Sequence, residues 1–353
     1  TLSLTGGYDS RMVFACIKDQ VPINVFISGD NESDPDIIFA KKAAQAGGQN
    51  LEVLKINKPQ ISENYLRELF EYAQGCVPLL NDGYLRISTF MKNRRANGYE
   101  CYLSGDGGVL HKDWWWVQDL PFYRKKNVNL KRFYNQRIAY IDGSLPFGNE
   151  LSRISDTIGD RFIHEFDQYI KPLNTQSYDS LYYNINGRKI VIQYSIHSKV
   201  IPSYAPLWEL ELVRYSYHLP RRKRFFYNSM RKITTTNSRS IARVPTVYGT
   251  TASDELVYIL RDIFFQGIDY YKKAVRMLGR KFLNRSLFVS GPTTWSAEDE
   301  VRMLDISKRA LEYCIDKEFI KQDTQLKTIS YNTLGRMIQV YMLAEQMCKY
   351  DRD

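Results

Sequence analysis

The segment from Leu2 to Met12, LSLTGGYDSRM, constrains the fold more than any other part of the chain. An apolar alternating stretch leads into two adjacent glycines, and a helix-like run, MVFACIKD, follows them. This order predicts a strand, a tight turn and a helix, an arrangement that gathers backbone N–H groups around an anion. Because glycine has no Cβ, the backbone at Gly6 and Gly7 can approach a phosphate closely.

Polar side chains flank the two glycines. Thr5 and Ser10 add hydroxyl groups, and Asp9 adds a hard oxygen ligand suited to Mg²⁺. A plain surface turn also uses Gly-Gly, but the hydroxyls, the carboxylate and the strand-to-helix context favour a nucleotide site. The run lacks the GK[ST] ending of a Walker A loop, so it is a different kind of phosphate loop.

Strand and helix patterns alternate along the first third of the chain, which predicts an α/β core with a parallel twisted sheet and helices on both faces. The expected strands are residues 2–4, 22–28, 51–56 and 100–103. The expected helices are residues 12–18, 34–46, a segment from Ile61, and 84–96, with Asp34 or Ser33 as the cap of the second. Ligands of such sheets bind at the carboxyl ends of the strands, where the glycine turn lies.

Strand patterns fade after about residue 120. We therefore expect a nucleotide-binding core at residues 1–120 and a mainly helical part at residues 121–353 that packs on the core. Ser296 with Asp299 predicts a helix start. The positions expected along one face of that helix are Val301, Leu304, Lys308, Leu311 and Ile315. A last amphipathic helix is expected around residues 334–342.

Composition excludes several classes of protein. The 353 residues include 5 cysteines without a CxxC pair and 4 histidines without metal-ligand spacing, which argues against disulfide and zinc frameworks and favours a cytoplasmic location. No apolar run approaches the roughly 18 residues that span a bilayer, so we expect no membrane partner. The net charge of +10 fits nucleic acid, or a site for ATP, pyrophosphate and a carboxylate, while any single basic run is most simply a solvated surface.

A second glycine-rich turn follows the strand predicted at residues 100–103. Residues 102–111 read YLSGDGGVLH, which places Ser104, Gly105 and Asp106 at the end of that strand. Taken alone, the run is equally well a flexible turn. Two such loops at the ends of two strands of one sheet are expected to face each other across an ATP molecule.

Together these motifs resemble the C-terminal synthetase domain of class II asparagine synthetases and their relatives, including β-lactam synthetases. The family pattern is SGGxDS, a helix with spaced Asp and Ala, SG[ED]GxDE, and a PFLD…LVE…LP segment. This chain has TGGYDS, DPDIIFAKKAA, SGDGG and APLWELELVRYSYHLP in the same order, across about residues 1–225. The resemblance implies the PP-loop fold, which is adenine nucleotide alpha-hydrolase-like.

The resemblance also implies an activity, that of an ATP-dependent, AMP-forming carbon–nitrogen ligase. Such an enzyme binds ATP and Mg²⁺, activates a carboxylate as an acyl-adenylate with release of pyrophosphate, and lets ammonia or an amine attack the acyl carbon. The protein must stabilise the charge that gathers on pyrophosphate. Ammonia would come from a glutaminase domain, which we expect to precede Thr1.

Individual residues take roles by their positions in the motifs. The nucleotide-binding residues that the resemblance implies are Leu4, Thr5, Gly6, Gly7, Asp9, Ser10, Ile27, Ser104 and Gly105. Asp9 would bind Mg²⁺, and Leu4 and Ile27 would border the adenosine. Asp106 would lie near the reacting carboxylate or amine. Arg243 would supply positive charge where the family has a catalytic lysine.

The chain also departs from the family pattern. Val109 stands where the family has an aspartate that helps to bind Mg²⁺-pyrophosphate, and Asp113 is the nearest candidate to replace it. Pro245 stands where the lysine is expected. The residues Trp114–Trp116 follow the second loop and would serve either as core or interface packing or as a platform for a carboxylate other than aspartate.

Two other functions remain open at this point. The departures at Val109 and Pro245 motivate a catalytically degenerate nucleotide-binding or scaffold protein of the same fold, although the intact TGGYDS run argues against it. The net charge motivates a PP-loop enzyme that acts on RNA. The absence of paired cysteines and the presence of the APLWELELVRYSYHLP segment count against that reading, so we do not expect a nucleic-acid partner.

Overall fold

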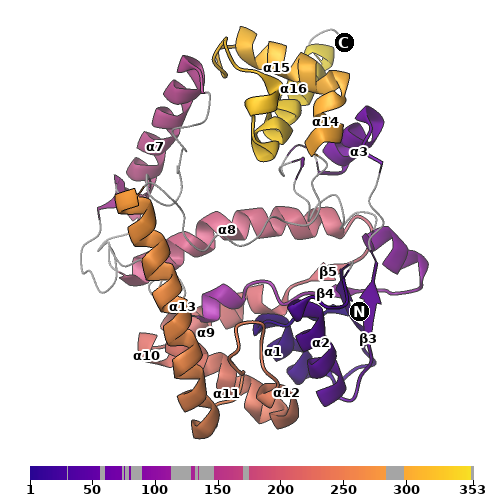
Figure 1. Ribbon diagram of the computed structural model, residues 1–353, viewed down its shortest axis with the longest axis vertical. Helices are drawn as coiled ribbons and strands as arrows, with labels where there is room; N and C mark the ends of the chain where they lie inside the picture. The colour runs from indigo at the N-terminus through magenta and orange to yellow at the C-terminus, as the bar shows by residue number, and fades with distance from the viewer. Residues whose placement is uncertain are drawn as a thin grey trace. The chain divides into compact units, whose positions relative to one another are not determined.

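The computed structural model contains two compact units, which are described separately (Figure 1). The first unit comprises Thr1–Asn57, Arg94–Gln118 and Ile201–Thr294, and the second comprises Lys58–Asn93, Asp119–Val200 and Trp295–Asp353. The structure describes residues 1–29, 31–55, 60–73, 75, 79–80, 90–112, 129–131, 134, 147–169, 175–283 and 298–350. The expected division at residue 120 stays a prediction.

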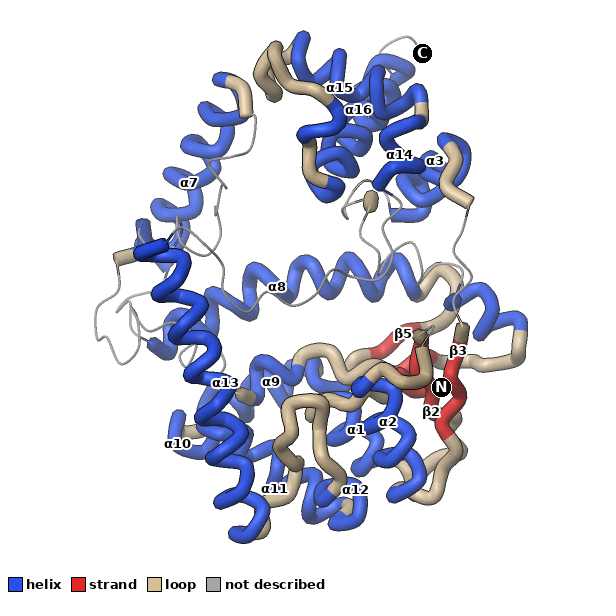
Figure 2. The backbone as a smooth tube through the Cα atoms, in the orientation of Figure 1, coloured by secondary structure: helices blue, strands red, loops and turns tan. Residues whose placement is uncertain are grey.

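A five-stranded parallel sheet lies in the first unit (Figure 2). Its strands are β1 (Leu2–Ser3), β2 (Val25–Ser28), β3 (Leu51–Leu54), β4 (Tyr102–Leu103) and β5 (Ser203–Tyr204). The order across the sheet is β3-β2-β1-β4-β5, and all four pairings are parallel. The four strands expected from the sequence are present in shortened form, and β5 is an addition to them. The α/β fold is therefore confirmed.

The strand order reverses beside β1. The chain runs from β1 to β2 and β3 on one side of the sheet, and then continues with β4 and β5 on the other side. Leu2 pairs with Val25 of β2 and with Leu103 of β4, so β1 lies between the two halves. Such a reversal brings the segments that follow β1 and β4 together at the carboxyl edge of the sheet, where α/β proteins bind ligands.

The helices of the first unit follow from local sequence signals. They are α1 (Asp9–Ile17), α2 (Pro35–Ala46), η1 (Gly108–His111), η2 (Pro206–Trp208), α9 (Leu210–His218), α10 (Arg221–Arg224), η3 (Phe225–Tyr227), α11 (Asn228–Asn237), α12 (Arg239–Arg243) and α13 (Leu256–Leu283). In α2 the Asp34 side chain caps the helix by accepting from Asp36 N, and Pro35 takes the first position. The predicted cap is thus confirmed.

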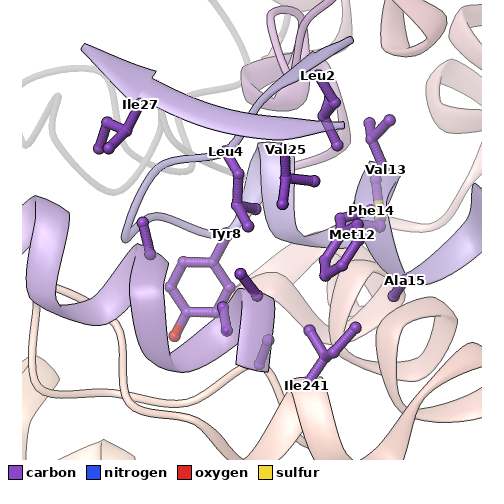
Figure 3. Packing of buried hydrophobic residues seen from close by; sticks show 14 of the residues in the cluster. Leu2, Leu4, Tyr8, Met12, Val13, Phe14, Ala15, Val25, Ile27 and Ile241 are labelled. Carbon is purple, nitrogen blue, oxygen red and sulfur yellow. The ribbon is translucent and has the colours of Figure 1, made fainter. Parts of the chain in front are cut away.

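Different side chains pack on the two faces of the sheet. Leu2, Val25 and Ile27 belong to a buried cluster with Phe14 of α1 and Ile241 of α12 (Figure 3). Side chains alternate along a strand, so Phe26 points to the opposite face. There the guanidinium of Arg94, from a helical segment at residues 90–96, lies 4.5 Å from the Phe26 ring centroid. Helices thus cover one face of the sheet and Arg94 contacts the other, while the expected cover of both faces by helices stays a prediction.

The described part of the second unit is helical. Its elements are α3 (Glu63–Ala73), α7 (Asn149–Tyr169), α8 (Thr175–His197), α14 (Glu298–Met303), α15 (Asp305–Asp316), η4 (Leu326–Thr328) and α16 (Tyr331–Tyr350). The single helix expected through residues 301–315 is wrong, because Leu304 is extended at φ −72° and ψ 142° and divides it into α14 and α15. The expected start at Ser296 and residues 84–89 lie outside the described residues.

A second hydrophobic core holds α3, α14, α15 and α16 together. Leu66, Leu334 and Ile338 are fully buried in it. This core is separate in composition from the cluster under the sheet, so each unit has an apolar interior of its own. Among the described helices, none is both long enough and apolar enough to cross a lipid bilayer.

Candidate functional site

Two glycine-rich loops meet at the carboxyl edge of the sheet. The first loop, Thr5–Ser10, joins β1 to α1 and includes the first two residues of that helix. The second loop, Ser104–Gly108, joins β4 to η1 and includes the first residue of η1. A Cβ added to Gly105 would overlap the backbone nitrogen of Ser10, and a Cβ added to Gly108 would overlap the carboxyl group of Asp9. The two loops therefore lie side by side as expected, and glycine is required at both contacts.

Hydrogen bonds within the first loop fix its backbone. Thr5 N donates to Ser10 Oγ at 2.9 Å, and the two hydroxyl oxygens of these residues are 3.0 Å apart. Gly7 N donates to Thr5 Oγ1 at 3.3 Å. The predicted pyrophosphate residues Thr5, Gly7 and Ser10 are thus brought together, with their hydroxyls bridging the two ends of the turn.

A carboxylate of the protein binds a backbone N–H of the first loop. Gly6 N donates to Asp36 Oδ1 at 2.8 Å, from the first turn of α2. Burial raises the pKa of Asp36, and the Gly6 hydrogen bond opposes that rise. The sequence marks Asp36 only as part of the DPDIIFAKKAA helix. The contact shows that the loop binds an anionic oxygen and that this oxygen is already supplied at Gly6.

Asp9, the expected Mg²⁺ ligand, is paired with a lysine. Lys112 Nζ lies 2.7 Å from Oδ1 and 2.8 Å from Oδ2 of Asp9. Among the described residues, no group of three or more His, Cys, Asp or Glu side chains could hold a metal ion. Since an ammonium group is in contact with both carboxylate oxygens, a protein-bound Mg²⁺ does not fit at Asp9 in this arrangement.

Two stacked tyrosines form the wall beside Lys112. Lys112 Nζ lies 5.4 Å from the ring centroid of Tyr227, whose ring stacks on that of Tyr8 with centroids 4.4 Å apart and an angle of 7°. Tyr227 adopts a left-handed backbone conformation with φ 59°. Burial raises the pKa of Tyr8 to about 12, so its hydroxyl stays protonated. Sequence reasoning missed both Lys112 and Tyr227.

A buried ion pair is hydrogen-bonded to the hydroxyl of Tyr8 and so holds the tyrosine stack in place. Arg231 Nη1 lies 2.8 Å from Asp262 Oδ2, and Arg231 Nη2 donates to the Tyr8 hydroxyl at 3.1 Å. Asp262 also accepts from the backbone N and the hydroxyl of Thr251, each at 2.8 Å. Both charged side chains are at most 1% exposed. Buried charges of this kind are stable only when they are fully hydrogen-bonded.

Residues 244–251, here called the strap, cross over the first loop. Val247 N donates to Gly6 O at 3.1 Å, and a Cβ on Gly6 would lie 2.6 Å from Val247 Cγ1. Arg11 of α1 is fully buried and donates to the carbonyl oxygens of Val244, Pro245 and Gly6. Burial lowers the pKa of Arg11 to about 10. The strap is thus fixed to the loop through backbone atoms.

The two expected catalytic residues have different surroundings. Arg243 is exposed at the end of α12 and forms an ion pair with Glu255 at 2.6 Å. The segment after Arg243 reaches the first loop, but it does so through the strap rather than through the Arg243 side chain. Asp106 is exposed on the second loop, where its backbone N donates to Ser104 Oγ at 2.9 Å. Its expected role beside a reacting group stays a prediction.

The remaining candidates lie in the core or outside the described residues. Leu4 is 0% exposed and Ile27 is 4% exposed, and both belong to the cluster under the sheet (Figure 3). Their expected position beside an adenosine stays a prediction. Asp113 and the Trp114–Trp116 run lie outside the described residues.

The APLWELELVRYSYHLP segment anchors the second loop. His111 Nε2 lies 3.1 Å from Leu207 O, and His111 Nδ1 is in contact with Ser216 Oγ. Gly107, at φ 98°, has no room for a Cβ because Trp208 Cδ1 would lie 2.6 Å away. Burial lowers the pKa of His111, which favours the neutral form of the ring. The SGDGG loop and the APLWELELVRYSYHLP segment, which are far apart in the sequence, are thus packed against each other.

The two comparisons with known proteins do not name a family for the chain. A scan against protein-family models finds no matching family, and a search of curated proteins finds no significant match.

Proposed function

We propose that this protein is an ATP-dependent carbon–nitrogen ligase of the asparagine-synthetase type. The observation that carries the proposal is the contact between the two glycine-rich loops at the point where the order of the parallel strands reverses. Open α/β sheets bind their ligands at such a point. The ordered motifs TGGYDS, SGDGG and APLWELELVRYSYHLP support the choice of this ligase over other nucleotide-binding proteins.

The proposed reaction has two steps. A carboxylate oxygen attacks the α-phosphorus of ATP and pyrophosphate leaves; ammonia or an amine then attacks the acyl carbon and AMP leaves. The hydroxyls of Thr5 and Ser10, together with the N-terminus of α1, would bind the pyrophosphate oxygens. Asp106 is exposed on the facing loop and is the candidate for orienting the carboxylate or the amine. Fixed donors of this kind stabilise the charge on the departing group.

Several parts of the proposal come from the resemblance alone. The supply of ammonia by a glutaminase domain is one of them. The cytoplasmic location is proposed from the unpaired cysteines, and the absence of a nucleic-acid partner from the lack of cysteine pairs together with the APLWELELVRYSYHLP segment. The carboxylate is a small molecule or part of a glycan or peptide.

Pyrophosphate release tests the proposal. The chain is incubated with ATP, ammonia and a panel of amino-acid, sugar-acid and peptide carboxylates, and pyrophosphate is measured for wild type, Ser10→Ala and Ser33→Ala. Release that depends on one carboxylate, falls about tenfold or more in Ser10→Ala and is unchanged in Ser33→Ala supports the proposal. Ser33 is a suitable control because it lies in an exposed turn, bonded to Asn31.

A second candidate function is nucleotide binding without catalysis. Two observations favour it: Asp36 already binds the Gly6 N–H group, and Arg243 is paired with Glu255 instead of lying on the loop. ATP binding by a folded chain that releases no pyrophosphate with any carboxylate, also in the presence of a glutaminase partner, would favour this candidate over the ligase.

A further inference from the structure

Lys112 takes the place that the resemblance gives to a metal ion. Its ammonium group contacts both oxygens of the Asp9 carboxylate, at 2.7 and 2.8 Å. We propose that Lys112 is the resident cation of this site and that it holds the phosphates of a nucleotide directly, without a metal ion on Asp9. This inference rests on the proposed nucleotide-binding function and deepens it.

Charge balance supports the exchange of a metal for a lysine. The family pattern has two aspartates around Mg²⁺, and the charges of the two carboxylates and the metal ion sum to zero. This chain has Val109 at the second aspartate position and adds Lys112 three residues later, so that Asp9 and Lys112 also sum to zero. A site with one carboxylate and one ammonium group therefore has the same net charge as a site with two carboxylates and Mg²⁺.

The Asp9–Lys112 pair is more shielded than an ordinary surface pair. The Lys112 side chain is 13% exposed and the Asp9 side chain is 27% exposed. The pair of Lys41 with Glu32 has the same 2.7 Å separation, but its members are 36% and 68% exposed. Since water screens an exposed pair more strongly, Lys112 is held in place more firmly than Lys41.

The surroundings of Lys112 fix its position on the remaining sides. The Tyr227 ring lies 5.4 Å from Nζ, and an aromatic face attracts a cation. Tyr227 is itself held by its stack on Tyr8, which is hydrogen-bonded to Thr250 at 2.5 Å and to Arg231. The left-handed conformation of Tyr227 carries a strain that such a network must compensate. The result is a preorganised ammonium rather than a mobile surface lysine.

The chemistry of an ammonium group allows the second contact that the proposal requires. Lysine carries three N–H donors and no acceptor. One donor is bonded to Asp9 Oδ2 while Oδ1 is in ion-pair contact with the same group, so N–H donors remain for a phosphate oxygen. Hydrogen bonds between charged partners are short and strong. Lys112 lies on the segment that follows the second loop, beside the N-terminus of α1. An ammonium in that place bridges the carboxylate and an incoming phosphate as a metal ion does.

Calorimetric titration with ATP, in buffer with EDTA and in buffer with Mg²⁺, distinguishes the two kinds of site. The proteins are wild type, Lys112→Gln, Lys112→Arg, Asp9→Asn and the control Lys41→Gln. The substitutions at Asp9 and Lys112 have different expected effects in the two cases. In a metal site Asp9 is a direct ligand of the cation, whereas in a lysine site it orients Lys112, an interaction that an asparagine oxygen also makes, while its negative charge opposes the incoming phosphate.

The proposal expects wild type to bind ATP in EDTA with an affinity within about threefold of that in Mg²⁺. Lys112→Gln should weaken binding about tenfold or more in both buffers. Asp9→Asn should bind ATP at least as tightly as wild type, and Lys112→Arg and Lys41→Gln should retain binding.

ATP binding that requires Mg²⁺, is lost in Asp9→Asn and survives in Lys112→Gln overturns the lysine site and leaves the proposed function standing. A folded wild type that binds ATP in neither buffer overturns the nucleotide site itself. The comparison of the two buffers uses only wild type, so it decides the question even if a variant fails to fold.

Discussion

The loop region of the first unit and the helical core of the second unit are stabilised in opposite ways. Around the loops, the fully buried large side chains include the charged residues Arg11 and Arg231, and Asp262 is buried with them. In the helical core the buried side chains are mainly apolar, with the hydroxyl of Ser307 bonded to Val301 O, and charges such as Arg67 and Glu345 lie at its partly exposed edge. The first region depends on specific polar partners, whereas the second depends on filled volume.

Because of this difference, we expect the loop region to be sensitive to substitution and the helical core to tolerate substitutions that keep the volume. A buried charge is costly to desolvate and is stable only with its partners in place, so the loop region accepts one arrangement of its side chains. An apolar core accepts other side chains of similar volume at little cost. A site that must position phosphates benefits from the first kind of construction. The predictions below test this contrast, starting with the largest expected effect.

Removal of Arg231 should cause the largest loss of stability. Arg231→Met leaves Asp262 buried without its main partner and removes the bond to Tyr8, so we expect a loss of about 3–5 kcal/mol in the free energy of unfolding. Urea denaturation measures this loss. The double variant Arg231→Met/Asp262→Leu should recover part of it, because no buried charge is left unpaired. A loss below about 1 kcal/mol in the single variant would contradict the contrast.

The helical core should respond to volume instead of charge. Leu334 is 0% exposed, and Leu334→Ala should cost about 2–5 kcal/mol because it leaves a cavity. Leu334→Met keeps the volume and should cost less than about 1.5 kcal/mol. Denaturation of both variants in the same buffer gives the comparison. Equal losses in the two variants would show that this core also requires a specific side chain.

Glycines should divide into those that contact another backbone and those that do not. A Cβ on Gly105 would overlap Ser10 N, so Gly105→Ala should cost about 1–3 kcal/mol. A Cβ on Gly267, within α13, has no atom within 4 Å, so Gly267→Ala should raise stability by up to about 1 kcal/mol. Thermal unfolding of both variants tests the opposite signs. Equal effects would mean that the loops are not in contact.

Acid should weaken the anchor of the second loop. The folded state lowers the pKa of His111, so below the ordinary value of about 6.5 the unfolded chain binds a proton that the folded chain does not. Stability should therefore fall as the pH drops below about 6.5, by at most about 1.4 kcal/mol per pH unit. His111→Asn removes this titration. Denaturation at pH 7 and pH 5.5 should show a larger loss in wild type than in the variant.

The smallest effect is expected at the edge of the helical core. Arg67 Nη1 lies 2.9 Å from Glu345, but the two side chains are 37% and 29% exposed. Glu345→Gln should cost only about 0.2–1 kcal/mol, and less in 1 M salt, because water and ions screen the pair. Unfolding in low and high salt measures both values. A loss as large as that of Arg231→Met would remove the distinction between the two regions.

The sequence predicts those parts of the fold that depend on neighbouring residues. The strand, turn and helix at Leu2–Ile17 follow from an alternating pattern, two glycines and a helical run. Asp34 and Pro35 mark the start of α2 because the cap and the first helical turn are local contacts. The parallel sheet and the approach of the two loops follow from the order of these elements, since parallel strands present their carboxyl ends at one edge.

Long-range contacts explain what the sequence leaves unpredicted. Pro202 and Pro206 flank strand β5, which hides it in the sequence because proline disfavours strands, and β5 exists because it pairs with β4. The break at Leu304 carries no glycine or proline signal. Lys112 and Asp36 look like ordinary surface charges in the sequence. Their roles arise only when folding brings them to Asp9 and Gly6, and no local pattern records that contact.

Arg11 attaches the strap to the first loop through backbone atoms alone, so this attachment does not depend on the side chains of Val244 and Pro245. Arg11 grips only carbonyl oxygens of Val244, Pro245 and Gly6, and every amino acid has a carbonyl oxygen. Thr250 and Thr251 of the strap are fixed by their own hydrogen bonds to Tyr8 and Asp262, whereas Tyr248 is 62% exposed. An exchange at Tyr248 therefore leaves the hold of Arg11 on the strap in place. The strap can thus vary at this outward-facing side chain while its attachment to the first loop stays the same.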